Sequence, residues 1–258
     1  MSDPRGPLVD TCIVVPCYNE QHRIHLGDFH ALISPTTRLL FVDDGSTDRT
    51  AKLLSDWSET RPGAEVLCLG SNSGKAEAVR AGIVRAIDEG AEYVAYFDAD
   101  LASPPQELFR IIDLVRSTPA IDVALGARIA ILGADIERTR SRHFQGRIFA
   151  TIASMILDLR VYDTQCGLKV FRVNPTLVEA FSEPFRSKWV FDVELLMRLL
   201  RGTTPLAARA IVEVPLREWR DVGGSSLGFR ARCRSLADLA AIGWRHRTTR
   251  FSPHRTRT

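Results

Sequence analysis

The chain has 258 residues, of which 45% are hydrophobic and 25% charged, a composition typical of a globular protein. This length suits one large α/β domain or two small ones, and it can bury a full core without disulfides or metals. The five cysteines form no CxxC or CxxH pair, which argues against a structural zinc site and favours a reducing, cytoplasmic environment. The sequence contains neither a secretory signal nor about 18 consecutive apolar residues, so we expect neither export nor a transmembrane helix.

The net charge of +3 conceals two oppositely charged parts of the chain. Residues 228–258 contain eight arginines and one acidic residue, a net charge of +7, which leaves −4 on the remainder. An arginine-rich tail suits an anionic partner, such as a lipid surface, a nucleic acid or a phosphate-bearing substrate. A solubilising or disordered terminus would show the same composition, and the sequence leaves both interpretations open.

In the first half of the chain, apolar runs typical of buried strands alternate with helical patterns. The expected strands cover residues 11–18, 39–44, 64–70 and 92–100, and the expected helices cover residues 46–59 and 74–90. The first helix begins with Ser, Thr and Asp, which are good N-cap residues, and the second ends at a glycine that suits a C-cap. This alternation predicts parallel strands covered by helices.

The second half of the chain is less regular. Strands are expected over residues 122–129, 166–172 and 210–219, and helices over residues 143–159 and 189–201, with a loop or short helical region over residues 127–142. No linker or internal repeat interrupts the chain before its basic tail. We therefore predict a single domain.

Polar residues gather where four of the expected strands end. The segments are PCYNE at residues 16–20, DDGSTD at 43–48, GSNSGK at 70–75 and DADLASPP at 98–105. In open α/β sheets, ligands bind beyond the carboxyl ends of the strands. Any one segment could be a turn or a helix cap, but capping alone does not explain all four at one edge.

The second and third of these segments carry weaker signals. In DDGSTD, Asp-Gly favours a turn and Ser46, Thr47 or Asp48 suits a helix cap. Neither role requires Asp43, whose carboxylate could accept hydrogen bonds from a base or a ribose. GSNSGK lacks the P-loop spacing, yet Lys75 after a glycine at a helix start favours an anion.

The DAD segment at residues 98–100 is the centre of the predicted site. Asp98 and Asp100 could simply form an acidic loop or cap. Alternatively, they could turn toward one point and bind Mg²⁺ or Mn²⁺, which takes one or two protein carboxylates plus phosphate oxygens. Such a metal bridges a diphosphate and stabilises it as a leaving group.

Four motifs together resemble the family 2 glycosyltransferases of the GT-A fold. They are IVVPCYNE, VDDGSTD, NSGKAEAVRAGI and YFDADLASPP, in this order and spacing between about residues 12 and 105. Looser matches over residues 163–172, 189–196 and 213–227 look most like the dolichyl- and polyprenyl-phosphate sugar synthases, and DTQCG resembles the glucosyl members. The resemblance implies an α/β fold with one GT-A domain over residues 8–227 and a Rossmann-like, mostly parallel sheet. Its nucleotide-sugar half would span about 8–130 and its acceptor half about 131–227, before a basic helix and tail at 228–258.

The resemblance also implies roles for individual residues in donor binding. Asp43 would bind the uracil or ribose with Asp44 behind it, and Asp98 would lie close to the donor sugar or ribose. Asp100 would be the principal ligand of Mg²⁺ or Mn²⁺. Ala102 stands where some relatives have a further side-chain ligand, so water or phosphate would complete the metal shell. The remaining donor contacts would be Pro16, Tyr18, Asn19, Glu20, Lys75 and Ala99.

Acceptor binding is assigned to basic residues of the second half. The candidates are Arg140, Arg142, Arg147 and Gln165. The arginines lie beside an apolar helix pattern, which suits a phosphate head with an isoprenoid tail, although a solvated basic face would look the same. Arg217 and Arg220 would clamp the donor diphosphate or the acceptor phosphate, unless they merely occupy a surface strand. The GGSS segment that follows offers a flexible loop able to close over bound donor.

The need for a catalytic base depends on the acceptor. A hydroxyl acceptor requires a carboxylate to remove its proton, whereas a phosphate is already an anion near neutral pH. Asp192 and Glu194 are the candidate bases. Their i, i+2 spacing on a helix puts them on different faces, so we expect only one, Asp192, to point into the site.

These arguments predict an inverting, metal-dependent transferase that moves glucose from UDP-glucose to a polyprenyl phosphate. A soluble hydroxyl acceptor is the first alternative. A nucleotidyltransferase is a second, although that class usually begins with a Gly-rich, Arg/Lys-bearing loop rather than PCYNE. A non-catalytic nucleotide binder has less need of DAD. The basic tail and residues 235–244 could form a peripheral membrane contact, and we expect no nucleic-acid partner.

Overall fold

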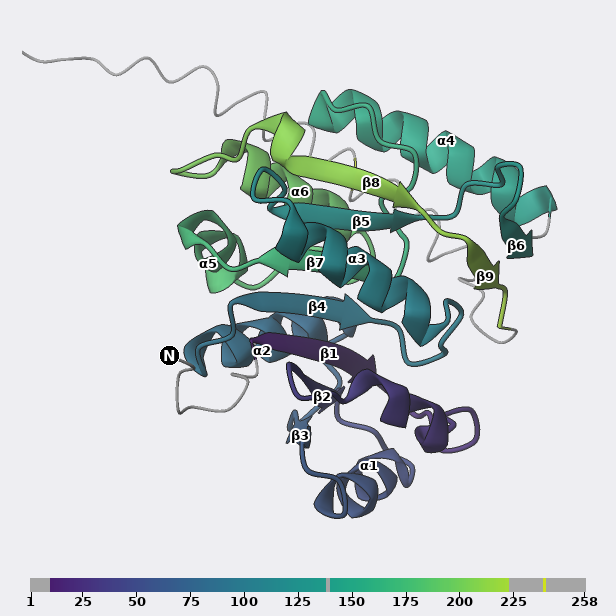
Figure 1. Ribbon diagram of the computed structural model, residues 1–258, viewed down its shortest axis with the longest axis vertical. Helices are drawn as coiled ribbons and strands as arrows, with labels where there is room; N and C mark the ends of the chain where they lie inside the picture. The colour runs from purple at the N-terminus through teal and green to yellow at the C-terminus, as the bar shows by residue number, and fades with distance from the viewer. Residues whose placement is uncertain (1–9, 138–139, 223–238, 240–258) are drawn as a thin grey trace, which may run out of the picture.

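The computed structural model describes residues 10–137, 140–222 and 239, and its core is a seven-stranded sheet flanked by helices (Figure 1). The strand order is β3-β2-β1-β4-β7-β5-β8. These strands are β1 Thr11–Cys17, β2 Thr37–Asp43, β3 Ala64–Cys68, β4 Tyr93–Phe97, β5 Val123–Ala127, β7 Leu168–Arg172 and β8 Ile211–Pro215. The predicted α/β fold with a mostly parallel sheet is therefore confirmed.

Strand β7 departs from the parallel pattern, because it runs antiparallel to both β4 and β5. The chain enters β7 beside the end of β4, where Leu168 pairs with Phe97. Since it starts at the carboxyl edge of the sheet, β7 can only run back toward the opposite edge. The segment before β7, which carries Gln165, is thereby brought to the same edge as the ends of β1 and β4.

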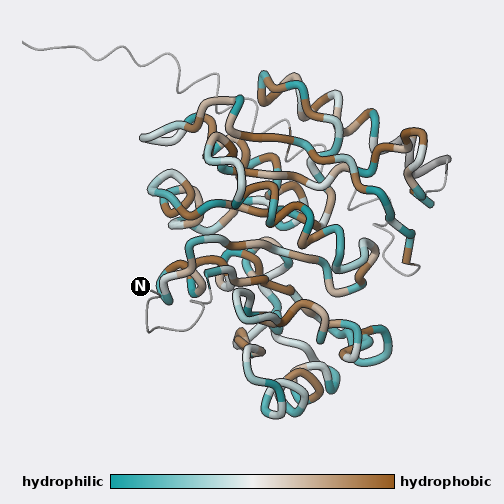
Figure 2. Tube along the Cα trace, in the orientation of Figure 1, coloured by the Kyte–Doolittle hydropathy of each residue, from teal (hydrophilic) through white to brown (hydrophobic). Residues whose placement is uncertain are grey.

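Helices cover both faces of the sheet. They are α1 Thr50–Glu59, α2 Lys75–Asp88, α3 Pro105–Ser117, α4 Arg140–Leu157, α5 Pro175–Ser182 and α6 Phe191–Arg201, with short 3₁₀ turns η1 Leu26–Leu32 and η2 Ala208–Ala210. Side chains of β1 alternate between two buried clusters: Val14 packs with α2, α5 and α6, whereas Val15 packs with α1 and α3. This alternation follows the two-residue period of a strand, and Figure 2 shows the central strands as mainly hydrophobic.

Helix α2 approaches the sheet closely because it carries a glycine at the contact. A Cβ atom at Gly82 would lie 2.4 Å from Val14 Cγ1 and 2.9 Å from Val42 Cγ2. The helix axis can therefore sit directly over β1 and β2. This packing fixes the first residue of the helix, Lys75, at the carboxyl edge of the sheet.

Several predicted boundaries are wrong. The helix expected from residue 46 begins at Thr50, because the preceding residues form a loop bonded to the segment after β1. The strand expected over 210–219 is two strands: β8, and β9 Glu218–Arg220, which pairs with β6 Asp135–Glu137 in a separate sheet. Helix α4 begins three residues earlier than expected, and α3 was not predicted at all.

The predicted basic helix and tail at 228–258 lies outside the described residues except for Leu239, which is fully buried in the core with α2, α5 and α6. The GGSS segment also lies outside them. Across the helices of residues 10–137 and 140–222, none has the length and apolar character needed to cross a membrane.

Candidate active site

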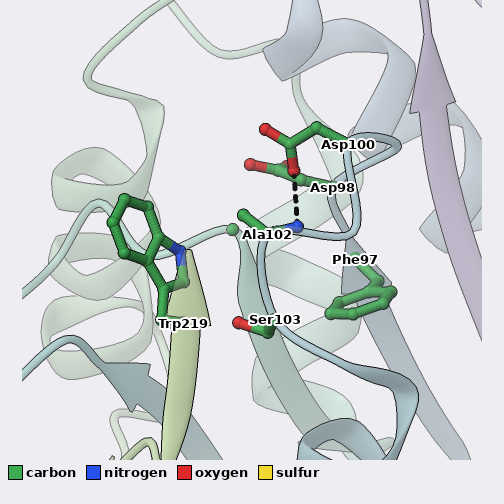
Figure 3. Close-up of a pocket in the computed structure, with 7 residues that line it drawn as sticks. Phe97, Asp98, Asp100, Ala102, Ser103 and Trp219 are labelled. Atoms are coloured by element: carbon green, nitrogen blue, oxygen red, sulfur yellow. Dashed lines mark hydrogen bonds between the residues drawn. The ribbon is translucent and has the colours of Figure 1, made fainter. Parts of the chain in front are cut away.

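A pocket opens at the carboxyl end of β4, and both predicted metal ligands line it. Its walls are Phe97, Asp98, Asp100, Ala102, Ser103, Gly167 and Trp219 (Figure 3). The chain turns sharply after β4, with Leu101 at a positive φ of 48°. This turn brings Asp98 and Asp100 onto the same side, and Figure 3 shows their carboxylates next to each other. The Ala102 N–H donates to Asp100 Oδ1 at 3.1 Å.

The electrostatics of the pocket favour a bound cation. Burial and the neighbouring charge of Asp98 raise the pKa of Asp100, which shows that negative charge is crowded here. Lys75 Nζ lies 2.5 Å from Asp98 Oδ1. Although burial lowers the pKa of Lys75, the charges of Asp98 and Asp192 outweigh this and raise it overall. The charge of Lys75 is therefore shared between Asp98 and Asp192.

The donor set fits a hard divalent cation that is shared with a substrate. Within residues 10–137 and 140–222, no group of three or more His, Cys, Asp or Glu side chains is placed to hold a metal. Asp98 and Asp100 would supply two oxygen ligands, and phosphate or water would supply the others. This sharing is the usual coordination of Mg²⁺ at phosphate sites.

Gly167, which precedes β7, makes room for Asp98. A Cβ atom at this position would lie 1.9 Å from Asp98 Oδ2, and the Asp98 N–H donates to Gly167 O at 3.0 Å. Any larger residue would push the carboxylate out of place. The glycine of the predicted DTQCG motif thus has a steric role at the pocket.

The segment after β1 is bonded to the segment after β2. Asn19 has a positive φ of 52°, its N–H donates to Ser46 Oγ at 3.0 Å, and its Oδ1 accepts from the Thr47 N–H at 2.9 Å. The Glu20 N–H donates to Thr50 Oγ1 at 2.7 Å. Asn19 therefore holds the two segments together, while the neighbouring Tyr18 ring is 41% exposed at the same edge.

The two aspartates at the end of β2 are in different environments. Each oxygen of Asp44 has a hydrogen-bond partner, because one accepts from the Ser73 N–H at 2.8 Å and the other from the Gly74 N–H at 2.7 Å. Asp43 Oδ2 accepts from the Ser46 N–H at 3.1 Å, but its buried Oδ1 has no hydrogen-bond partner among the residues that the structure describes. Such an orphaned acceptor suits a ligand donor. This arrangement fits the predicted placing of Asp43 against the donor and Asp44 behind it.

Asp192 lies behind the pocket in a buried cluster of polar side chains. Its Oδ1 is 2.9 Å from Lys169 Nζ and accepts from the Tyr96 hydroxyl, while its Oδ2 accepts from Gln165 Nε2 at 3.3 Å. Lys169 Nζ also donates to Tyr96 Oη and Cys166 O, each at 2.7 Å. Asp192 is 4% exposed and Lys169 is fully buried. The candidate base is thus held in an ion pair.

Glu194 points elsewhere. It accepts from the Arg198 guanidinium at 2.7 Å and from the Arg186 N–H at 3.0 Å. It therefore contacts neither Asp98 nor Lys75, whereas the charge of Asp192 acts on Lys75. Of the two candidate bases, Asp192 is the one whose charge acts on Lys75, although it does not line the pocket.

The predicted basic clamps, Arg217 and Arg220, are not among the residues that line the pocket. Arg217 is exposed, and its N–H donates to Glu107 Oε2 at 3.0 Å. Arg220 is also exposed, and its N–H donates to Ala102 O at 2.8 Å, which ties β9 to the loop that carries Asp100. Its guanidinium lies 3.6 Å from Asp135.

The acceptor candidates are only partly brought together. The Arg147 guanidinium stacks over the Tyr162 ring at 3.9 Å and donates to Tyr162 O at 3.3 Å, so it already has partners. Gln165 reaches the buried cluster through Asp192. Arg140 and Arg142 lie in the first turns of α4, and their side chains lie outside the described part of the structure.

Sequence analysis missed three residues of the site. Trp219 lines the pocket opposite the carboxylates, as Figure 3 shows, and Gly167 admits Asp98. Lys169 neutralises Asp192. A lysine in the middle of the apolar strand CGLKVFR was a usable signal, since a buried cation requires a partner. The other two depend on how separate segments pack, which no local pattern reveals.

Comparison with known proteins gives a consistent result. Residues 12–177 match the model of a family described as glycosyl transferase family 2. A dolichyl-phosphate beta-glucosyltransferase of Dictyostelium discoideum is 28% identical over 251 residues, covering 91% of this chain and 74% of the relative. The predicted resemblance is thereby confirmed.

Two solved structures share the fold at low sequence identity. Mannosyl-3-phosphoglycerate synthase from Rubrobacter xylanophilus has a TM-score of 0.70 at 18% identity, covering 97% of this chain and 77% of that one. Glucosyl-3-phosphoglycerate synthase from Mycobacterium tuberculosis, solved with Mn²⁺, uridine diphosphate and glucosyl-3-phosphoglycerate, has a TM-score of 0.59 at 18% identity, covering 91% and 76%. These likenesses confirm the predicted GT-A type of fold.

Proposed function

Because the chain belongs to glycosyl transferase family 2, we propose that it transfers glucose from UDP-glucose to the phosphate of a polyprenyl-type lipid. The family assignment sets aside the nucleotidyltransferase and the non-catalytic binder considered from the sequence. The dolichyl-phosphate beta-glucosyltransferase relative supports both the sugar and the class of acceptor. We place the enzyme at the cytoplasmic face of a membrane, where such a lipid presents its phosphate.

One observation carries the choice of acceptor. The candidate base nearer the pocket lysine, Asp192, is buried and paired with Lys169, so it is poorly placed to take a proton from a hydroxyl. A lipid phosphate needs no base, because it carries about 1.5 to 2 negative charges near neutral pH. An acceptor that arrives as an anion therefore suits this site better than a neutral hydroxyl does.

On the donor side, Asp98 and Asp100 would hold Mg²⁺ or Mn²⁺, whose positive charge stabilises a diphosphate leaving group. Lys75 adds a second positive charge beside Asp98. The open oxygen of Asp43 would accept a hydrogen bond from the ribose or the base, and the exposed Tyr18 ring would lie against the base. The solved relative with Mn²⁺ and uridine diphosphate is consistent with this arrangement.

The chemical step is a single displacement. An oxygen of the acceptor phosphate attacks the anomeric carbon, the bond from that carbon to the diphosphate breaks, and UDP leaves with the bonding electrons. The attacking oxygen is already deprotonated, so no proton has to be moved. Because attack comes from the face opposite the leaving group, the anomeric configuration inverts.

A soluble hydroxyl acceptor is the second candidate, since the two solved structures compared above are phosphoglycerate synthases. In that case Asp192 would have to exchange its contact with Lys169 for one with the acceptor. The two candidates differ in one testable respect, which is whether the acceptor must carry a phosphate at the attacking atom.

The test is UDP release from UDP-glucose with Mg²⁺ or Mn²⁺, measured with a short-chain polyprenyl phosphate, the matching polyprenol or 3-phosphoglycerate. GDP-mannose serves as the competing donor, for which GDP release is measured instead. We expect release only with UDP-glucose and the polyprenyl phosphate, and a glucosyl lipid phosphate as product. Release with 3-phosphoglycerate but not with the lipid phosphate would overturn the proposal and favour the hydroxyl acceptor.

A further inference from the structure

Exposed apolar side chains concentrate on one part of the molecule. The three largest exposures are Leu132, which is fully exposed, Met155 at 78% and Phe144 at 68%. Ile131 at 51% and Ile148 at 48% lie in the same part of the chain, whereas Trp189 at 49% lies elsewhere. Apart from Trp189, these residues lie on α4 or in the segment between β5 and β6. Exposed apolar side chains gathered on two consecutive segments of the chain indicate an interaction site more often than scattered exposed residues do.

Helix α4 carries three of these side chains on a single face. Phe144, Ile148 and Met155 are spaced i, i+4 and i+11, so they form one line along the helix. We call these three residues the α4 stripe. The opposite face of the helix, with Ala150, Ala153 and Leu157, is buried against the body of the protein. Figure 1 shows α4 at the outer edge of the molecule, so this line faces outward.

The charge around the stripe identifies the kind of partner. Residues 138–157 contain four arginines and no acidic residue, and the acids Asp135, Glu137 and Asp158 lie just outside this range. Arg147 is already stacked on Tyr162, and the sequence places the other three arginines at or just before the start of α4. An apolar helix face with a basic end complements an anionic lipid surface, where the apolar side chains enter the interface and the cations meet the headgroups.

The exposed surface is connected to the active-site pocket by the small sheet. β6 ends at Glu137, shortly before α4 begins, and it pairs with β9. β9 carries Trp219, which lines the pocket, and the Arg220 N–H bonds to Ala102 O in the loop of the carboxylates. A membrane that contacts α4 would therefore lie close to the pocket mouth.

We propose that the α4 stripe together with Leu132 docks this protein on an anionic bilayer. Only the role of this contact, which is to bring the pocket to the lipid phosphate, rests on the proposed function. The contact itself is independent of turnover. It also differs from the predicted membrane contact through the basic tail, because it places the apolar part of the contact on the folded domain.

The experiment is co-flotation of the full-length protein with vesicles of phosphatidylcholine containing phosphatidylglycerol, or of phosphatidylcholine alone. The test variants are Leu132→Asp and the double variant Phe144→Asp/Ile148→Asp. Val178→Asp on α5 and Leu53→Asp on α1 are matched controls, since Val178 is 45% and Leu53 37% exposed, against 48% for Ile148. We expect the wild type and both controls to float with the anionic vesicles, and the test variants to bind at least tenfold more weakly with unchanged melting temperatures.

Three results would overturn the inference. The first is that the test variants float with the anionic vesicles as well as the wild type does. If salt also abolished that binding equally in the wild type and in the test variants, the contact would be assigned to the basic tail. The second is equal loss in the controls. The third is a wild-type dimer that the test variants convert to monomers, which would show that a second copy covers this face.

A turnover assay separates this inference from the proposed function. With a short, water-soluble polyprenyl phosphate, Leu132→Asp should turn over like the wild type, because Leu132 lies outside the pocket and outside the apolar helix matched to the isoprenoid tail. Stripe-dependent vesicle binding without any lipid-phosphate turnover would refute the proposed function while supporting the docking surface.

Discussion

Two clusters of charged side chains meet near the carboxyl end of β4 and differ in character. Tyr96 belongs to the buried cluster, where Asp192 is paired with Lys169 and bonded to Gln165. Two residues further along, Asp98 lies in the pocket, where it is a third exposed and paired with Lys75. Buried charges persist only when they are paired, whereas the crowded carboxylates of the pocket leave room for a cation. The comparison separates a structural cluster from a reactive one.

The largest effect is expected from removing a pocket carboxylate. Asp100→Asn should lower kcat by about 10²- to 10³-fold, the loss typical of one electrostatic contact to a transition state. The free energy of unfolding should not fall, since the pKa of Asp100 is raised by burial and by Asp98, and the substitution removes that repulsion. Steady-state kinetics and urea denaturation measure the two quantities. A large loss of stability with little loss of kcat would place Asp100 in the structural cluster instead.

The buried cluster should respond in the opposite way. Lys169→Met leaves Asp192 as a buried, uncompensated charge, so we expect a loss of about 3–5 kcal/mol in the free energy of unfolding. The double variant Lys169→Met/Asp192→Leu removes both charges and should recover most of that loss. Urea denaturation of both variants provides the measurement. If the double variant were no more stable than the single one, the pairing of Lys169 with Asp192 would not be the reason for the cluster.

A third substitution, at Gly167, affects the position of Asp98 beside the buried cluster. Gly167→Ala puts a methyl group where Asp98 Oδ2 now lies, 1.9 Å from the new Cβ, so the carboxylate must move. A displacement of about 1 Å at a reacting centre can cost about 10²-fold in rate, and overpacking costs about 1–3 kcal/mol in stability. Gly27→Ala is the matched control, because its Cβ would meet nothing within 4 Å. Equal kinetics for the two variants would show that Asp98 tolerates displacement.

The two clusters also differ in how far the sequence predicts them. The segments DAD and DDGSTD predict the pocket, because they place polar residues at the ends of apolar strands. The order of the motifs then indicates the family to which such a pocket belongs. The buried cluster combines Tyr96, Lys169 and Asp192 from three separate elements. Its existence depends on β7 running antiparallel beside β4, which the alternation of strands and helices does not predict. Local patterns thus show where chemistry occurs, whereas the pairing of distant side chains requires the three-dimensional fold.

The smallest effect on kcat is expected at Glu194, two residues beyond Asp192 on α6. It accepts one hydrogen bond from Arg198 and one from the Arg186 N–H, and it is 8% exposed. Glu194→Gln keeps one acceptor oxygen and loses the charge, so we expect a loss of about 1.5–3 kcal/mol in stability, as for a hydrogen bond to a charged group, and a kcat close to that of the wild type. Kinetics with the lipid phosphate and with a hydroxyl acceptor check this. A selective loss of turnover with the hydroxyl acceptor would identify Glu194 as a base. Glu194 would then have to leave its contacts with Arg198 and Arg186 in order to reach the acceptor.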